Sequence, residues 1–390
     1  MREGWEYKKL GDVCTIERGG SPRPIADYIT ESADGINWIK IGDAVEESKY
    51  ILFTKEKIRP EGIKKSRFVH KGDVILSNSM SFGKPYILGI DGCIHDGWLV
   101  LHDNNNTFSK DYLYYVLSSP IMYSKFTQLA VGGVVNNLNS NIVREVVVAI
   151  PPLSTQQSIV SELDKINELI RLKKEQLKDY DNLAQSIFYE MFGDPVVNEK
   201  GWEVKKIGEV CLIERGGSPR PIKDYITEDE DGLNWIKIGD AQEGSIFINS
   251  TKEKIRKEGL KKTRMVHKGD FILSNSMSFG RPYIMGVDGC IHDGWLVLHD
   301  TNNTFNKLYL YYSLAHKSMY QQFKQMAVGG VVNNLNSEMV RRVLVLVPPL
   351  IVQQEFANRI ELIEMQKKQI ISTIQDLETL LASRMQYWFD

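Results

Sequence analysis

Basic side chains are concentrated in two segments of a chain that is otherwise close to neutral. The 390 residues carry 48 Lys and Arg against 50 Asp and Glu, which gives a formal net charge of −2. Residues 55–71 hold seven basic residues against two glutamates, and residues 252–268 hold eight against two. Such a segment favours contacts with nucleic-acid phosphates, although a solvated charged face has the same composition. The candidate phosphate contacts are Lys55, Lys57, Arg59, Lys64, Lys65, Arg67, Lys71, Lys252, Lys254, Arg256, Lys261, Lys262, Arg264 and Lys268.

Short polar motifs supply further candidates, this time for contacts with bases. The motif GGSPRP at 19–24 contains Arg23 and directly follows Arg18, and a guanidinium can bind phosphate or guanine through two hydrogen bonds. The motifs at 77–83 and 130–140 carry Ser and Asn, and Asn is a natural reader of adenine. Gly and Asn are equally typical of turns that need their backbone angles. With their copies, the candidates are Arg18, Arg23, Asn78, Ser79, Lys84, Asn136, Asn137, Arg215, Arg220, Asn275, Ser276, Arg281, Asn333 and Asn334.

No arrangement of nucleophile, base or metal ligand predicts catalysis within this chain. His95 and Asp96 are adjacent, and neighbours on a strand point to opposite faces, so we expect no acid–base pair there. Ser77 lies in no G-x-S-x-G context, and there is no Walker loop, H-E-x-x-H, N-P-P-Y or D-P-P-Y motif. The cysteines form no C-x-x-C pair and have no second ligand at a suitable spacing, so we expect reduced thiols and no metal. They are Cys14, Cys93, Cys211 and Cys290.

The candidate residues come in pairs because the chain is an internal duplication. Trp5 recurs as Trp202 and His95 recurs as His292, in each case 197 positions later. The offset holds without insertion from the Gly-Trp opening of each half to a Pro-Pro pair at 151–152 and 348–349. A period of this length is far beyond that of solenoid repeats and indicates a duplicated domain.

A long amphipathic segment follows each Pro-Pro pair. Apolar residues recur at steps of three and four, which predicts helices roughly 55 Å long at about 1.5 Å per residue. Two matching stripes in one chain are expected to cover each other. Lys173 and Lys367 interrupt the stripes, either fixing the alignment of the helices or reaching solvent from the edge. The predicted seam is Ile159, Leu163, Ile166, Ile170, Leu177, Ile187, Ile360, Ile363, Ile370, Ile374, Leu377 and Leu381.

Each half has the pattern of an α+β domain. Strands are predicted at 10–16, 37–41, 73–76, 85–90, 97–101 and 145–150, and a helix at 111–130 that breaks near Pro120. We therefore expect an α+β fold with two tandem-duplicated globular domains separated by two long helices. The expected boundaries are 1–150, 151–193, 194–347 and 348–390.

The sequence predicts no association with membranes. No apolar run approaches the roughly 20 residues that span a bilayer. The N-terminal residues lack the apolar core of a signal peptide. We expect a cytoplasmic protein without a membrane partner.

Together these motifs resemble the specificity subunit of type I restriction-modification systems. The resemblance rests on the opening GWEYKKLGDV, the GGSP loop, Trp38-Ile39 before Gly42-Asp43, the stretch DVILS at 73–77, and PPL with Gln156-Gln157 before the long helix. Each single motif is weak, but all return in order in the second half. The family often has Glu-Gln where this chain has Gln156-Gln157, which puts a carboxylate role there in doubt.

The resemblance implies two target-recognition domains and two helices that pair antiparallel as a molecular ruler. Each domain would bind one half of an interrupted site in double-stranded DNA, and the helices would set the gap. The implied partners are two methyltransferase subunits and an endonuclease/translocase subunit. No cofactor is expected in this chain, because S-adenosylmethionine would be bound by the methyltransferase.

The near-identity of the two halves adds an expectation beyond the family. Identical reading loops on antiparallel helices predict inverted, nearly identical half-sites, that is, an interrupted palindrome. Asymmetry could arise where the copies differ, as at Lys84 against Arg281. The main alternative is a coiled-coil scaffold that binds protein and not DNA. An acid–base pair of His95 and Asp96 acting on a small substrate is a more distant one.

Overall fold

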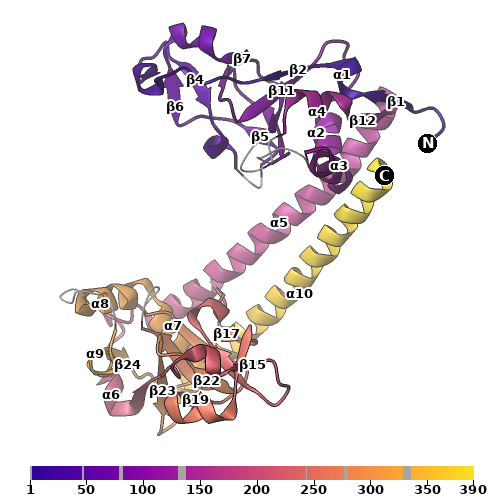
Figure 1. Cartoon of the computed structure of the whole chain (residues 1–390). Coiled ribbons are helices and arrows are strands. Elements are labelled where there is room, and N and C mark those ends of the chain that lie inside the picture. Colours follow the sequence, from indigo (N-terminus) through magenta and orange to yellow (C-terminus); the bar gives the residue numbers. More distant parts are fainter. Residues whose placement is uncertain are drawn as a thin grey trace. The chain divides into compact units, whose positions relative to one another are not determined.

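The duplicated halves fold into two compact units, which are described here one at a time. The computed structural model describes residues 2–45, 48–78, 82–130, 138–242, 244–275, 280–327 and 335–390. Contacts group Met1–Lys174 with Ser372–Asp390 in the first unit and Glu175–Ile371 in the second. Each unit therefore contains one duplicated domain and a stretch of both long helices (Figure 1).

The first domain mixes short strands and helices, as the sequence predicts. In chain order its elements are β1 (Glu6–Lys9), α1 (Leu10–Val13), β2 (Cys14–Arg18), η1 (Ile25–Asp27), β3 (Ile29–Thr30), β4 (Ile36–Ile39), η2 (Ile41–Asp43), β5 (Tyr50–Ile51), β6 (Glu56–Ile58), η3 (Pro60–Lys65), β7 (Arg67–Val69), β8 (Val74–Ser77), β9 (Pro85–Leu88), β10 (Gly92–Ile94), β11 (Trp98–Asp103), α2 (Lys110–Ser118), α3 (Pro120–Ala130), α4 (Ser140–Glu145) and β12 (Val147–Ile150).

The second domain repeats this order. Its elements are β13 (Val204–Lys206), α6 (Ile207–Val210), β14 (Cys211–Arg215), η4 (Ile222–Asp224), β15 (Ile226–Thr227), β16 (Leu233–Ile236), η5 (Ile238–Asp240), β17 (Phe247–Ile248), β18 (Glu253–Ile255), η6 (Lys257–Lys262), β19 (Arg264–Val266), β20 (Phe271–Ser274), β21 (Pro282–Met285), β22 (Gly289–Ile291), β23 (Trp295–Asp300), α7 (Lys307–Ala315), α8 (Lys317–Ala327), α9 (Ser337–Arg341) and β24 (Leu344–Leu346).

Two five-stranded sheets form the body of each domain. In the first domain their strand orders are β3-β6-β4-β10-β7 and β2-β11-β8-β9-β5. A two-stranded ladder of β1 with β12 joins the start of the domain to its end. Ile39 and Ile94 of the first sheet are in one buried cluster with Ile75 and Val100 of the second, so the two sheets share an apolar core. The second domain has the same sheets and an equivalent core.

A layer of helices covers the other side of the β2-β11-β8-β9-β5 sheet. Leu76 and Leu101 of that sheet are in one cluster with Tyr112 of α2, Phe126 of α3 and Ile159 of the first long helix. The predicted helix at 111–130 is present and divides at Pro120 as expected. The strand predicted at 10–16 is wrong in its first part.

That error has a simple cause. Residues Leu10–Val13 form the single helical turn α1, and the strand begins only at Cys14. Leu10 and Val13 are three residues apart, so one helical turn buries both while Gly11 and Asp12 stay exposed.

The two long helices are α5 (Leu153–Phe192) and α10 (Leu350–Phe389), and their predicted existence is confirmed. In the first unit the beginning of α5 packs with the end of α10, because Ile159 and Leu163 share a cluster with Met385. In the second unit the end of α5 packs with the beginning of α10, because Phe188 and Phe356 share a cluster. The helices are therefore antiparallel in each unit.

The predicted seam is largely buried. Eight of its twelve residues are at most 8% exposed: Ile159, Leu163, Ile166, Ile170, Ile360, Ile363, Ile370 and Ile374. The other four are half-buried: Leu177, Ile187, Leu377 and Leu381.

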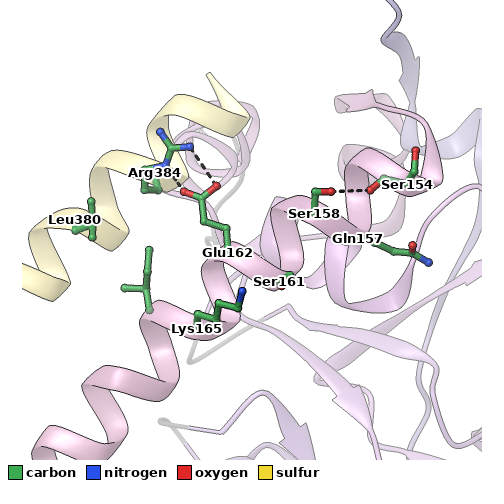
Figure 2. Close-up of a pocket in the computed structure, with 9 residues that line it drawn as sticks. Ser154, Gln157, Ser158, Ser161, Glu162, Lys165, Leu380 and Arg384 are labelled. Atoms are coloured by element: carbon green, nitrogen blue, oxygen red, sulfur yellow. Dashed lines mark hydrogen bonds and ion pairs between the residues drawn. The ribbon is translucent and has the colours of Figure 1, made fainter.

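Charged pairs connect the helices beside the seam. In the first unit two guanidinium nitrogens of Arg384 on α10 donate to the two carboxylate oxygens of Glu162 on α5 (Figure 2). The indole of Trp388 donates to the same carboxylate at 3.1 Å. In the second unit Lys367 Nζ lies 2.8 Å from Asp181 Oδ1 and its side chain is only 13% exposed. This pairing supports the alignment role for Lys367 over the alternative of a lysine that reaches solvent.

Candidate nucleic-acid interface

The GGSPRP loop and the His95–Asp96 turn meet at one carboxylate. Ser21 Oγ donates to Asp96 Oδ1 at 2.9 Å, and Arg23 Nη2 lies 3.5 Å from Asp96 Oδ2. Arg18 Nε donates to the backbone oxygen of Asp96 at 3.0 Å, and Asn78 Nδ2 donates to the same oxygen at 2.8 Å. Asp96 therefore holds residues from three separate sequence motifs in one place.

Two glycines allow this close approach. A Cβ on Gly19 would overlap the carbonyl oxygen of His95, and a Cβ on Gly20 would lie 2.8 Å from the carbonyl oxygen of Lys65. The Gly19 amide also donates to Trp98 O at 2.9 Å, in the strand that follows the turn. The loop thus packs backbone to backbone against the turn and against the end of the basic segment. This explains why no residue with a side chain fits at these two positions.

The basic segment runs along β6, η3 and β7, next to that loop. Its residues Lys57 and Arg67 are half-buried, and Arg67 Nη2 lies 3.3 Å from Glu17 Oε1. Lys65 Nζ donates to Tyr28 OH at 2.6 Å. Most of the segment stays available to a ligand, since the exposed members are Lys55, Arg59, Lys64, Lys65 and Lys71.

Asp96 is ionised at neutral pH despite its partial burial. Burial by itself would raise the pKa of this carboxyl group, but the Ser21 hydrogen bond and the nearby charges of His95, Arg18 and Arg23 outweigh it and lower the pKa. The same balance lowers the pKa of Asp293 in the second domain. The surface therefore combines exposed cations with one fixed anion.

The second domain reproduces this geometry with its own residues. Ser218 Oγ donates to Asp293 Oδ1 at 2.8 Å, Arg220 Nη2 lies 3.7 Å from Asp293 Oδ2, and Arg215 Nε donates to Asp293 O at 2.9 Å. Asn275 Nδ2 donates to the same backbone oxygen at 2.9 Å. The exposed lysines and arginines of this copy are Lys252, Arg256, Lys257, Lys261, Lys262, Arg264 and Lys268, and Lys254 is half-buried.

The expectation that His95 and Asp96 point apart is wrong. His95 Nε2 lies 2.9 Å from Asp96 Oδ1, and His292 Nε2 lies 3.0 Å from Asp293 Oδ1. The strand ends at Ile94, and residues 95–98 form a tight turn closed by Trp98 N donating to His95 O at 3.0 Å. Side-chain alternation does not apply in a turn, so adjacent side chains can converge.

Asn78 and Asn275 lie in the interior instead of facing outwards. Their side chains are 3% and 2% exposed, and both hold the backbone of the turn. A direct contact with DNA stays a prediction for them, and the geometry favours an indirect role in placing the turn. Lys84 is exposed and Arg281 is half-buried. The remaining candidates lie outside the described residues: Ser79, Asn136, Asn137, Ser276, Asn333 and Asn334.

Each domain is fastened to its long helix by a buried glutamine that sequence reasoning did not single out as structural. Gln156 accepts from Ser109 N at 2.8 Å and donates to Thr107 O at 2.9 Å and to Pro151 O at 3.0 Å. Gln353 makes the equivalent three bonds in the second domain. Two of the bonds need an amide donor, so a glutamate could not replace this residue without losing them. In the sequence, the one sign of this role was the Gln156-Gln157 pair at a place where the family often has Glu-Gln.

Metal ligands and cysteines are two further kinds of group that could carry chemistry in the part of the chain that the structure describes. This part contains no group of three or more His, Cys, Asp or Glu side chains placed to hold a metal ion. All four cysteines are buried, and burial raises the pKa of Cys14 and Cys211 to about 12 and that of Cys93 and Cys290 to about 11. No helix among the described residues is both long and apolar enough to cross a membrane.

Comparison with known sequences finds one family across both halves. Residues 2–179 and 199–378 each match the type I restriction modification DNA specificity domain. Among curated proteins, the MjaIX specificity subunit of a type I restriction enzyme from Methanocaldococcus jannaschii is 26% identical over 269 residues, which cover 63% of this chain and 61% of that protein. The MjaVIII specificity subunit of the same organism is 22% identical over 398 residues, covering 94% and 88%.

Solved structures show the same fold. A chain from a structural study of complex assembly and conformational transition of the type I R-M system covers 99% of this chain and 97% of its own length, with a TM-score of 0.68 and 20% identity. The S subunit of a type I restriction-modification system from M. genitalium covers 99% and 96%, with a TM-score of 0.54 and 13% identity.

Proposed function

The chain belongs to the family of type I restriction-modification DNA specificity subunits, and from that premise we propose that its two domains read inverted, nearly identical halves of one interrupted DNA site. Within the family this is a non-catalytic component with two target-recognition domains. The DNA half-site that each domain recognises and the partner subunits of the complex are both part of this proposal.

The observation that carries the proposal is that the hydrogen bonds and ion pairs around Asp96 recur around Asp293. The Asp96 and Asp293 clusters use the same residue types with distances that agree within a few tenths of an ångström. Base readout follows from which groups reach the groove and from how they are held. Two surfaces built alike would therefore select like sequences, and antiparallel helices would present them in inverted orientation.

The partners follow from the same proposal. Double-stranded DNA would contact the exposed basic residues, two methyltransferase subunits would supply S-adenosylmethionine and the catalytic groups, and an endonuclease/translocase subunit would complete the assembly. The long helices would set the gap between the half-sites and dock the methyltransferases. The complex would act in the cytoplasm.

The test is long-read methylome sequencing of a host that expresses this chain with its neighbouring methyltransferase. The control is the same host with the methyltransferase alone. A new methylated motif made of inverted half-sites around an unspecified gap would support the proposal. An asymmetric two-part motif would contradict the palindrome and move specificity to positions where the copies differ, such as Lys257, which binds Asp231 at 2.8 Å where the first domain has Pro60. No new methylation, with both proteins expressed, would contradict DNA selection and favour a protein-binding scaffold.

A further inference from the structure

Arg23 and Arg220 of the GGSPRP loops are the most exposed of the described interface arginines that pair with a carboxylate. Arg23 is 82% exposed and Arg220 is 80% exposed, yet each guanidinium has a carboxylate on one side, 3.5 Å away in the first domain and 3.7 Å away in the second. By contrast, Arg18 donates its Nε to a backbone oxygen, and Arg67 is less exposed and paired with Glu17. The guanidinium of Arg23 is thus accessible to a ligand, and the Asp96 carboxylate restrains its orientation.

We propose that Arg23 and Arg220 are specificity-determining residues that each read one guanine, at equivalent positions of the two half-sites, and that Asp96 and Asp293 are the positioning residues that aim them. This inference rests on the proposed DNA-reading function and names the base that the site reads. It separates these two arginines from the lysines, which bind phosphate.

Charge decides between phosphate and base as the target of Arg23. The Arg23–Asp96 pair is close to neutral, because the pKa of Asp96 is lowered and the carboxylate carries its full negative charge. A neutral pair gains little from a phosphate, and its carboxylate would repel one. Lys64 is exposed and has no carboxylate partner among the described residues, so it suits the phosphates better. Binding at a base edge does not require net positive charge.

Shape favours guanine over the other bases. A guanidinium presents parallel N–H donors, and guanine shows two acceptors, O6 and N7, side by side in the major groove. Holding the side chain in one direction before binding reduces the conformational entropy that is lost when it contacts a base. Asp96 is itself fixed by Ser21 and His95, so the loop, the turn and the arginine form one preorganised unit.

The two copies provide an internal control for the experiment. The variants Arg23→Ala and Arg220→Ala, each as full chain in complex with its methyltransferase, are compared with Lys64→Ala and Lys261→Ala from the same surface. Methylome sequencing gives the motif, and methylation rates on duplexes with each base at each position give the discrimination.

The expected result is loss of preference for one guanine in one half-site for Arg23→Ala, and for the equivalent guanine in the other half-site for Arg220→Ala. Discrimination at that position should fall by roughly 5- to 100-fold. Lys64→Ala and Lys261→Ala should slow methylation of all sequences alike and leave the motif unchanged. Asp96→Asn should lower discrimination at the base pair that Arg23 reads. The base preferences at the other positions of the DNA site should not change.

A wild-type motif without a guanine at equivalent places in both half-sites would overturn the inference and leave DNA reading intact. So would an Arg23→Ala variant that slows every sequence equally, because that is the behaviour of a phosphate contact. Arg23→Gln, which keeps a long polar side chain, and thermal melting of each variant distinguish a lost contact from a misfolded loop. If the wild-type complex directs no methylation at all, the proposed function fails first and the inference falls with it.

Discussion

Lys49 Nζ lies 2.7 Å from Asp164 Oδ1 on the long helix α5 and 2.8 Å from Asp111 Oδ1 on α2. The lysine is only 17% exposed and links the first domain to its helix. Burial alone would lower the pKa of Lys49, but the two carboxylates raise it above its ordinary value. In the second domain Ile246 stands where the first has Lys49, and Leu308 stands where it has Asp111. Both residues are buried. One junction is thus ionic and the other apolar.

Replacing Lys49 by isoleucine should destabilise the first unit by about 2–4 kcal/mol, because it leaves two carboxylates half-buried without their cation. The double variant Lys49→Ile with Asp111→Leu copies the second domain and should recover a large part of that loss. Urea unfolding followed by tryptophan fluorescence gives both values. A double variant no more stable than Lys49→Ile would show that the ion pairs do not account for the effect.

Gln156→Glu should destabilise the first unit by about 2–4 kcal/mol, because it removes two amide donors and places a carboxylate in a fully buried position. The neighbouring variant Gln157→Glu is the matched control, since Gln157 is exposed, and it should change the unfolding free energy by less than about 0.5 kcal/mol. Equal effects of the two variants would mean that the charge of the helix start matters, and not the hydrogen bonds of Gln156.

Gly19→Ala should disturb the candidate interface, because its Cβ would overlap the carbonyl oxygen of His95. Relief of that overlap should cost about 1–3 kcal/mol and shift the GGSPRP loop, so DNA affinity should fall as well. Gly42→Ala is the control, because a Cβ there meets nothing within 4 Å. Calorimetry and gel shifts on both variants give the comparison. A neutral Gly19→Ala would rule out tight packing of loop against turn.

His102 gives the first domain a dependence on pH. The Asp73 carboxylate, whose Oδ1 lies 3.6 Å from His102 Nδ1, raises the pKa of the imidazole above 6.5, more than burial lowers it. The charged form therefore stabilises the domain fully below about pH 6.5, and this contribution is lost as the pH rises through the folded-state pKa. Melting temperatures between pH 6 and 8 should fall more steeply for the wild type than for His102→Gln. Parallel curves would show that His102 does not contribute.

The periodic features of this fold could be predicted from the sequence because they depend on local order. The duplication, both long helices, their seam and the break at Pro120 all follow from spacing along the chain. The α+β class was predicted from the same kind of local pattern, and it is confirmed. Where a local pattern was short, as at Leu10–Val13, its two buried residues were too few to tell a helical turn from a strand.

The candidate interface could be predicted only in its components. Ser21 and Asp96 are 75 positions apart, and no spacing indicates that Ser21 binds the side chain of Asp96 while Asn78 binds its backbone oxygen. The sequence likewise could not show that Asn78 is buried and Arg23 exposed, since both lie in short polar motifs. Alternation along a strand was the wrong rule for His95 and Asp96, because the strand ends one residue earlier.

Removing Lys64 and Lys261 together should lower the salt dependence of DNA binding without changing sequence preference. Both side chains are exposed, carry no compensating carboxylate among the contacts of the described residues, and lie at equivalent places in the two domains. Each phosphate contact that is lost should reduce the slope of log K against log salt by about 0.9. The control is Lys178→Ala with Lys200→Ala, two lysines outside the basic segments, which should leave the slope unchanged. If both pairs changed the slope equally, the charge of the whole chain would attract DNA, and not the basic segments.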